Sequence, residues 1–407
     1  MPKSSRRIIV LDILRALAIV LVLGRHLPPL QNAFPLWIRP ALHQWTDFGW
    51  IGVDLFFVLS GFLISGLLFG EYQRYGRIRV GRFLVRRGFK IYPPFYVMIA
   101  TFICVQAMYK NYELIPLGGT LSEVFFVQNY HMGLLDLTWT LAVEEHFYLL
   151  LPLALVFLIW RDRGRGKPFR WLPLAWLLIS VAVLGARIIT ASLFPYSNRR
   201  NLMPTHLRFD SLLFGVLISY YYHFFPEQTM GLARRFRWLL LVAGVAFVLP
   251  ECLQNLWDFF VCTFGYSCLY IGFGLILLAG ITFRLPTTGL RSIPLRVLAF
   301  VGAHSYSIYL WQMPVKWWLS GWLRQWFHLK PSPQLDAIVY LCGSIGVGII
   351  LSLAVEKPVL AIRDRLAPSR SKALQMTRDG QAALHPTLPP TPTAPANPET
   401  GTQLVIG

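Results

Sequence analysis

Long apolar segments recur along nearly the whole chain and are separated by polar loops. Hydrophobic residues make up 55% of the sequence and charged residues 14%, whereas soluble proteins contain about a quarter charged residues. A stretch of about 20 apolar residues is long enough to cross a bilayer as an α-helix. The pattern therefore predicts an all-α, polytopic integral membrane protein with about ten transmembrane helices. We expect these spans near residues 8–30, 48–70, 91–109, 139–160, 171–194, 206–225, 238–250, 257–283, 296–320 and 335–356.

The distribution of basic residues indicates how the chain is oriented. The net charge is +19, but Lys and Arg gather in alternate loops, as they do on the cytoplasmic side of membrane proteins. With the N-terminus inside, the expected outside loops contain only Arg39, Lys110, Arg199, Arg200, Arg324 and Lys330. This predicts an N-in/C-in, multi-pass protein of the inner (plasma) membrane, in contact with the lipid bilayer. The same distribution argues against nucleic acid as a partner.

The domain organisation follows from composition. Near Pro368 the apolar periodicity gives way to a Pro- and Thr-rich stretch. We expect residues 1–362 to form one transmembrane domain and residues 363–407 to form a disordered cytoplasmic tail. The five cysteines form no CxxC motif or Cys/His cluster, so neither a metal site nor a disulfide framework is predicted. The first apolar run is too long for a cleavable signal peptide and lacks a small-residue cleavage site.

The first expected span contains four ionisable residues, Asp12, Arg15, Arg25 and His26. Such groups cost roughly a few kcal/mol each in hydrocarbon, so they usually face a protein interior and mark a substrate or proton path. Arg15 and His26 are eleven positions apart, which in a helix places them within about 20° of one direction and about 16 Å apart. This stripe predicts a polar channel. Arg15 also has a simpler alternative, an ion pair with Asp12 on the same helix face.

Further polar residues lie at the expected outer ends of three other spans. They are Asp54 in the second span, Trp139, Glu144 and Glu145 in the fourth, and Arg208 and Asp210 in the sixth. Together with His26 they are expected to lie at one depth. Asp54, Arg208 and Asp210 have two open interpretations, direct participation in a reaction or a buried ion-pair scaffold, because buried charges need partners.

The imidazole and the two glutamates suit acid–base chemistry. An imidazole ordinarily titrates near neutrality, so His26 can remove a proton from a hydroxyl. A carboxylate beside it would hold its tautomer, and Glu144 or Glu145 has the expected depth. Successive helical residues point about 100° apart, so only one of the two is expected to face the site. We favour Glu144 as the catalytic glutamate and Glu145 as a structural residue.

A run of basic residues precedes the third span and includes Arg82, Arg86, Arg87 and Lys90. Arg82, Arg86 and Lys90 follow one another at intervals of four, which forms a basic helical stripe that Pro93 ends. Two interpretations are open. The stripe contacts anionic lipid headgroups, or it binds a phosphorylated or nucleotide-bearing acyl donor, because arginine matches the geometry of phosphate oxygens.

Seven motifs occur in a fixed order along the chain. They are LDILRALAIVLVLGRH (with ten residues between Arg15 and His26), GVDLFFVLSGFLI, RRGFKIYPPFY, TWTLAVEEHFYLLLP, HLRFDSLLFG, VGAHSYSIYLWQMP and Glu356-Lys357-Pro358. In this order they resemble the membrane acyltransferase-3 family, which includes sugar O-acetyltransferases of cell envelopes. The resemblance covers about residues 8–362. The sequence departs from the family pattern at Lys90, Thr140, His146 and Gln312, where Arg, Ser, Gln and His are usual.

The resemblance implies an enzyme that moves an acyl group, usually acetyl from cytoplasmic acetyl-CoA, onto a hydroxyl of an envelope carbohydrate or a related glycosylated acceptor. Acyl-CoA would be a substrate, and no tightly bound cofactor is expected. The implied site residues are His26, Glu144 and Glu145 for catalysis, Arg15, Arg82, Arg86, Arg87 and Lys90 for binding the acyl donor, and Asp54, Trp139, Tyr148, Arg208, Asp210, Ser305 and Tyr306 for support.

Direct transfer and an acyl-enzyme intermediate are both compatible with these residues. A proton-coupled transporter or exporter is the alternative function, because it would also need buried Arg, His and Glu. Transporters more often contain broken helices and internal symmetry between halves, and no half-to-half repeat is found in this sequence.

Overall fold

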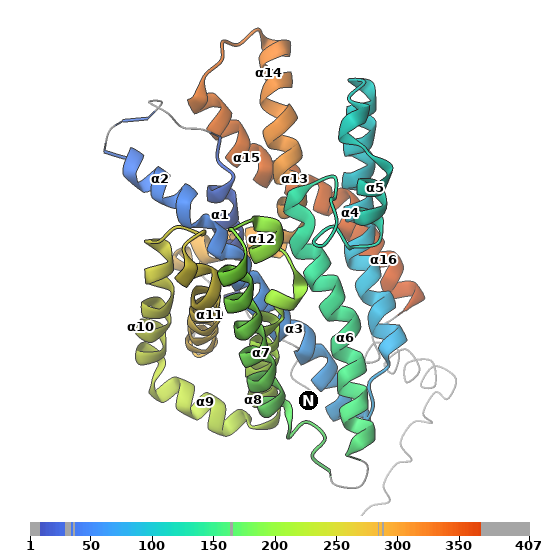
Figure 1. Cartoon of the computed structure of the whole chain (residues 1–407), viewed down its shortest axis with the longest axis vertical. Helices are drawn as coiled ribbons and strands as arrows, with labels where there is room; N and C mark the ends of the chain where they lie inside the picture. Colours follow the sequence, from blue (N-terminus) through green and yellow to red (C-terminus); the bar gives the residue numbers. More distant parts are fainter. Residues whose placement is uncertain are drawn as a thin grey trace, which may run out of the picture. The chain divides into compact units, whose positions relative to one another are not determined.

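The computed structural model describes residues 9–28, 34–35, 37–162, 166–283, 285–286 and 289–367. Every regular element within these ranges is a helix (Figure 1), which confirms the predicted all-α class. The tail expected to be disordered falls mainly on residues 368–407, which lie outside the described ranges. Described residues up to Leu360 belong to one compact unit, and those from Ala361 belong to a second.

The α-helices follow one another along the chain and are joined by shorter helical turns. The α-helices are α1 (Ile9–Arg25), α2 (Arg39–Phe48), α3 (Gly52–Tyr75), α4 (Val80–Met108), α5 (Leu117–Val124), α6 (Trp139–Arg161), α7 (Leu172–Leu193), α8 (Phe209–Phe224), α9 (Pro226–Arg235), α10 (Arg237–Val248), α11 (Tyr266–Gly280), α12 (Ile293–Ala303), α13 (Ser305–Pro314), α14 (Ser320–Phe327), α15 (Pro333–Leu351) and α16 (Lys357–Leu366). The turns are η1 (Gly49–Ile51), η2 (Tyr112–Leu114), η3 (Asp136–Thr138), η4 (Asn198–Leu202), η5 (Thr205–Leu207), η6 (Leu249–Cys252), η7 (Val261–Gly265), η8 (Leu290–Ser292), η9 (Val315–Leu319) and η10 (Ser352–Glu356).

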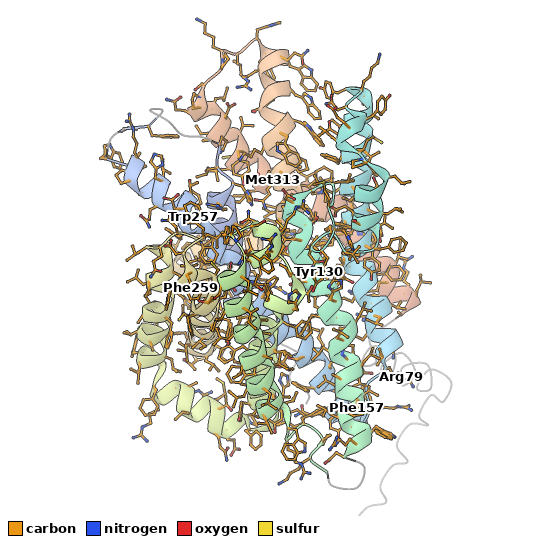
Figure 2. All side chains as sticks on the ribbon, in the orientation of Figure 1. Arg79, Tyr130, Phe157, Trp257, Phe259 and Met313 are labelled. Atoms are coloured by element: carbon orange, nitrogen blue, oxygen red, sulfur yellow. The ribbon has the colours of Figure 1, made fainter. Side chains whose placement is uncertain are left out.

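Within the described residues, six helical segments are long and apolar enough to cross a membrane. They are Arg39–Tyr75, Val80–Met108, Asp136–Arg161, Leu172–Leu193, Val261–Gly280 and Pro333–Leu366. The other expected spans coincide with shorter helices, such as α1, α8 and α10. Large apolar side chains remain exposed on the protein surface, including Phe157, Trp257 and Phe259 (Figure 2), as expected where lipid replaces water. The structure therefore supports a membrane protein with several spans, while ten spans and the N-in/C-in orientation stay predictions.

Helix α3 is central to the packing of the first unit, where it contacts α1, α6, α8 and α11. Its closest approach is to α8, and glycines make that approach possible. A Cβ atom added at Gly61 would lie 1.9 Å from the Leu212 carbonyl oxygen, and one added at Gly215 would lie 2.2 Å from the Val58 carbonyl oxygen. Small residues at such crossings let helix backbones meet in a membrane. This contact brings the polar side chains of α3 and α8 together.

Helix α4 carries the basic stripe in its first turns and continues through Pro93 and Pro94. Proline inside a helix removes backbone hydrogen bonds, and in a membrane neighbouring groups must satisfy the carbonyls that are left. Near the two prolines, the Tyr306 hydroxyl from α13 donates a hydrogen bond of 2.8 Å to the Ile91 carbonyl. The expectation that Pro93 ends the helix was therefore wrong, because packing against α13 and α6 supports its continuation.

The segment between α4 and α6 is organised around the carboxyl group of Glu123, which is fully buried. It accepts hydrogen bonds from the backbone N–H groups of Leu134 and Leu135, both at 3.0 Å, and from the Thr138 hydroxyl at 2.8 Å. Burial outweighs these bonds and raises the pKa of Glu123 to about 7. The carboxyl group thus fixes the segment that leads into α6.

This raised pKa predicts a pH-dependent stability. The folded state holds a proton on Glu123 that the unfolded chain has lost above its ordinary pKa of 4.5, so stability should fall as the pH rises from about 5 to about 7. Glu123→Gln keeps an oxygen acceptor and should remove this contribution. Thermal unfolding across the pH range, with exposed Glu113→Gln as the matched control, measures it. The same slope in Glu123→Gln and in the unmodified protein would contradict the assignment.

Candidate functional site

A buried polar cluster joins α3, α4 and α6. Arg87 donates a hydrogen bond of 2.6 Å to the Tyr148 hydroxyl, and its guanidinium carbon lies 4.2 Å from the centre of the Tyr148 ring. The Tyr148 and Ser60 hydroxyl oxygens are also 2.6 Å apart. Each helix therefore supplies one member of a continuous chain of hydrogen bonds, and Tyr148 is almost completely buried.

The two glutamates of α6 face different neighbours. Glu144 lies beside the Ser60 and Tyr148 hydroxyls and interacts electrostatically with Arg87 and Arg15. Glu145 accepts a hydrogen bond of 3.0 Å from the Tyr92 hydroxyl on α4. Adjacent helical residues point about 100° apart, and the structure follows this rule. Glu144 is thus the glutamate that lies beside the Ser60 and Tyr148 hydroxyls, while Arg87 acts electrostatically on both glutamates.

His26 lies just beyond the end of α1, in a different environment. The charged groups that act on its imidazole are Lys316 of η9 and Arg25. In the described part of the chain, no hydrogen bond or ion pair joins His26 to Glu144 or Glu145. The expected contact between His26 and a glutamate is therefore wrong. The reason is position along α1: Glu144 interacts with Arg15, whose backbone lies about 16 Å from His26 along the helix axis.

Asp54, Arg208 and Asp210 form a buried ion-pair network that also includes Arg187. Arg208 on the α8 side is 2.7 Å from Asp54 of α3, and Arg187 of α7 is 2.6 Å from Asp210. All four side chains are buried from solvent. The Arg208 guanidinium also lies 4.0 Å from the centre of the Tyr266 ring. Of the two interpretations considered from the sequence, these contacts match the buried ion-pair scaffold. They join α3, α7, α8 and α11.

The basic residues of α4 divide into two groups. Arg87 points into the protein against Tyr148, so it is not a surface contact for lipid headgroups. Arg82, Arg86 and Lys90 are half-buried in the first turns of the helix.

Arg15 of α1 forms an ion pair of 3.4 Å with Asp12, which is the simpler of the two alternatives considered from the sequence. Arg15 also acts electrostatically on Glu144.

The remaining predicted residues lie around this cluster. Trp139 is buried at the start of α6, with its ring edge-on to Phe57 at 6.0 Å between ring centres. Ser305 and Tyr306 begin α13, and Tyr306 ties that helix to α4. No group of three or more His, Cys, Asp or Glu residues that could hold a metal ion occurs among the residues described.

Three residues of these clusters were missed by the sequence reasoning, namely Ser60, Tyr92 and Arg187. A signal existed for Ser60, because it is a hydroxyl in the middle of the apolar run GVDLFFVLSGFLI. Arg187 was visible as a cation within an expected span, but its partner Asp210 comes from another helix. Tyr92 carried no signal beyond its place near the two prolines.

Comparison with known proteins places the whole membrane unit in one family. The family model described as an acyltransferase domain, of the acyltransferase-3 family, matches residues 8–356. O-acetyltransferase OatA of Staphylococcus aureus (strain NCTC 8325 / PS 47) is 26% identical over 382 residues, which cover 88% of this chain and 58% of that protein. Peptidoglycan O-acetyltransferase OatA of Listeria monocytogenes serovar 1/2a is 28% identical over 327 residues, covering 75% of this chain and 49% of that protein.

The chain thus spans about half the length of these relatives. No solved structure matches it. The transporter alternative gains no support, because the matched family and the named relatives are acyltransferases.

Proposed function

This chain belongs to the acyltransferase-3 family, and on that premise we propose that it is an integral membrane O-acyltransferase of the inner membrane. It moves an acyl group, by preference acetyl, from cytoplasmic acyl-CoA to a hydroxyl of an envelope carbohydrate. The names of the relatives point to peptidoglycan as the first acceptor to test.

One observation carries this proposal: Arg15 of α1 lies close enough to Glu144 to act on it electrostatically. It interacts with Glu144 in the Arg87 cluster, and it lies on the same helix stripe as His26, about 16 Å away. Arg87 belongs to the helix that carries the basic stripe. Polar side chains therefore extend from the basic end of α4 through the cluster to Arg15, and the stretch of α1 from Ala16 to Gly24 that leads on to Arg25 and His26 is apolar. Buried ionisable groups arranged in this way mark a substrate path in a membrane protein.

The chemistry follows from the residues at each end. His26 takes the proton of the acceptor hydroxyl as its oxygen attacks the thioester carbonyl. The new C–O bond forms, the C–S bond breaks, and CoA leaves as a thiolate that is reprotonated. Glu144 does not orient His26. It fixes Arg87 and the Ser60 and Tyr148 hydroxyls beside the path of the acyl donor.

The test of this function is acyl transfer by the purified protein. Acetyl-labelled acetyl-CoA is supplied with peptidoglycan fragments, and other envelope saccharides are tested in parallel. We expect base-labile label on the carbohydrate, as an O-acetyl ester would give. Absence of ester label from every acceptor, in a preparation that is folded and monodisperse, would contradict the proposal.

The basic stripe of α4 should contribute to binding the acyl donor. Arg86→Ala is expected to weaken CoA affinity by about tenfold to a hundredfold, because a hydrogen bond to a charged group contributes about 1.5–3 kcal/mol. The affinity should also become less sensitive to salt. Titration calorimetry measures both, with exposed Arg77→Ala as the matched control. Unchanged CoA affinity in Arg86→Ala would favour the lipid-headgroup interpretation of the stripe.

A further inference from the structure

Two aromatic side chains, Tyr130 and His206, form an exposed aromatic surface beside α6. Tyr130 (Figure 2) lies in the segment before α6 and is 49% exposed, and His206 is an exposed residue of η5. Their rings are nearly parallel, at 16°, with centres 5.8 Å apart. The Tyr130 hydroxyl lies 3.0 Å from the His206 Nδ1 and accepts a hydrogen bond of 3.3 Å from the His206 backbone N–H. The two offset rings together present a wider flat surface than either ring alone.

Buried polar contacts fix the base of the aromatic surface. The buried side-chain nitrogen of Asn129 donates a hydrogen bond of 2.7 Å to the Thr205 hydroxyl. The Nδ1 atom of His146, on α6, lies 2.7 Å from the same hydroxyl. Asn129 directly precedes Tyr130 in the sequence, and the residue after Thr205 carries the second ring. Each exposed ring thus follows an anchored residue, so little conformational freedom is lost when a ligand binds.

An ion pair lies at the edge of the aromatic surface. Arg199 is 2.8 Å from Asp136, and both side chains are exposed. The same guanidinium donates a hydrogen bond of 3.4 Å to the carbonyl of His131, the residue after Tyr130. Hydrogen bonds to charged groups are stronger than those between neutral groups. The flat rings therefore lie beside a charged donor and a charged acceptor that solvent can reach.

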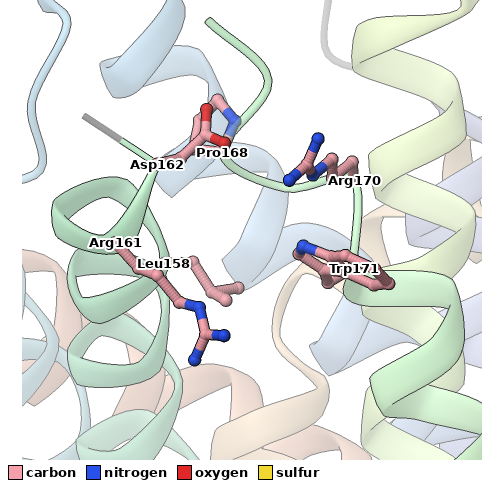
Figure 3. A pocket seen from close by; sticks show the side chains of 6 residues that line it. All are labelled: Leu158, Arg161, Asp162, Pro168, Arg170 and Trp171. Atoms are coloured by element: carbon pink, nitrogen blue, oxygen red, sulfur yellow. The ribbon is translucent and has the colours of Figure 1, made fainter. Parts of the chain in front are cut away.

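This combination of groups suits a carbohydrate. A sugar ring presents C–H groups on one face, and these pack on an aromatic ring, whose face carries partial negative charge. Hydroxyls around the edge of the sugar can hydrogen-bond to the charged side chains. The pocket between the end of α6 and the start of α7 (Figure 3) has a volume of about 10 Å³, room for about one water molecule. A saccharide fits the open aromatic surface but not that pocket.

The aromatic surface lies at the same end of the helix packing as His26. Arg208, just after the second ring of the surface, pairs with Asp54 in the first turn of α3. Gly49, just before α3, packs against the end of α1, because a Cβ added there would lie 2.6 Å from the Arg25 backbone nitrogen. His26 is the next residue. A glycan chain extends over several sugar units, so one unit can lie on the aromatic surface while another reaches His26.

We propose that the aromatic surface and the ion pair at its edge bind the carbohydrate acceptor, with a sugar ring on the two aromatic rings and its hydroxyls on the charged groups. The inference rests on the proposed function, because it takes a carbohydrate as the acyl acceptor. The sugar unit held here neighbours the unit that is acylated. Tyrosines at a membrane interface also contact lipid headgroups, and a surface with that role alone would contribute nothing to glycan binding.

Binding of a peptidoglycan oligosaccharide by the full chain in lipid-free detergent tests the proposal. Tyr130→Ala and His206→Ala each remove one ring, whereas Tyr130→Phe keeps the ring and loses only the hydroxyl. Asp136→Asn alters the exposed ion pair and provides the answer if a ring variant does not fold. Tyr112→Ala is the matched control, because Tyr112 is an exposed tyrosine of η2, outside the aromatic surface. The KM values for the oligosaccharide and for acetyl-CoA are measured alongside in the acetyl-transfer assay.

We expect each ring-removing variant to weaken oligosaccharide affinity and to raise its KM by about tenfold, because an aromatic contact adds to the free energy of apolar burial. Asp136→Asn should weaken the affinity by about threefold to tenfold, the loss of one hydrogen bond. Tyr130→Phe and Tyr112→Ala should bind as the unmodified protein does. The KM for acetyl-CoA should stay the same throughout.

Unchanged oligosaccharide affinity in the folded ring variants and in Asp136→Asn would overturn the proposal, as would an equal loss in Tyr112→Ala. The proposed function survives either outcome if these variants still acetylate the oligosaccharide. If the unmodified protein binds the oligosaccharide but acetylates no envelope saccharide, the proposed function fails and the binding surface stands. If it neither binds nor acetylates any saccharide, both fail.

Discussion

His26→Ala is expected to lower acyl transfer by about 10²–10⁴-fold, the usual cost of removing a general base. The imidazole lies just beyond the end of α1, where no ion pair or hydrogen bond from its side chain holds the described fold together. The substitution should therefore leave expression, membrane insertion and thermal unfolding almost unchanged. Initial rates of transfer from labelled acetyl-CoA at saturating acceptor measure the effect.

His43→Ala is the matched control for this prediction, because His43 is an exposed histidine of α2. It should transfer acyl groups at the normal rate. Full activity in His26→Ala would remove His26 from the mechanism. A loss of activity that accompanied unfolding would assign His26 a structural role instead.

Arg208→Met is expected to destabilise the protein by about 3–5 kcal/mol, because it leaves the Asp54 carboxylate buried without its partner. The two side chains are 2.7 Å apart and fully buried. The double variant Asp54→Leu with Arg208→Met should recover much of this loss, since replacing both members of a buried ion pair with apolar residues is often neutral. Denaturation of the purified protein in detergent measures the three stabilities.

The exposed pair of Arg199 and Asp136 supplies the control for that series. Its atoms are 2.8 Å apart, but its side chains are 39% and 75% exposed, so Arg199→Ala should cost only about 0–1 kcal/mol. Equal effects in Arg208→Met and Arg199→Ala would contradict the structural role of the buried pair. Failure of the double variant to recover stability would show that other contacts of Arg208 contribute to stability about as much as the ion pair with Asp54 does.

Much of the architecture could be predicted from the sequence because its signals are local. The apolar runs gave the all-α class, and helix geometry gave both the Arg15–Asp12 pair and the divergence of Glu144 from Glu145. Each of these depends only on spacing within one helix. The opposite charges near Asp54 and Arg208 likewise indicated a buried ion pair, since unpaired charges are costly in an apolar interior.

The relations between helices could not be predicted in the same way. Helix periodicity predicts that Arg87 and Arg86 lie on different faces of α4. It does not predict that Tyr148 from α6 covers the face that carries Arg87. His26 was assigned a glutamate neighbour from expected depth, and the structure gives it Lys316 from η9 instead. The expected ninth span is divided at His304 and again by the turn η9, and apolar periodicity does not show such a break.

Transport of the acyl group across a sealed membrane tests the central claim most directly. The protein is reconstituted in sealed vesicles of known orientation, with labelled acetyl-CoA supplied on the side of the α4 basic stripe. A membrane-impermeant peptidoglycan fragment is placed on the opposite side. We predict that this fragment acquires label in an ester bond and that the His26→Ala protein leaves it unlabelled. Label that reaches the acceptor only when both substrates share one side would contradict transfer across the membrane, and no label in any arrangement would contradict acyl transfer itself.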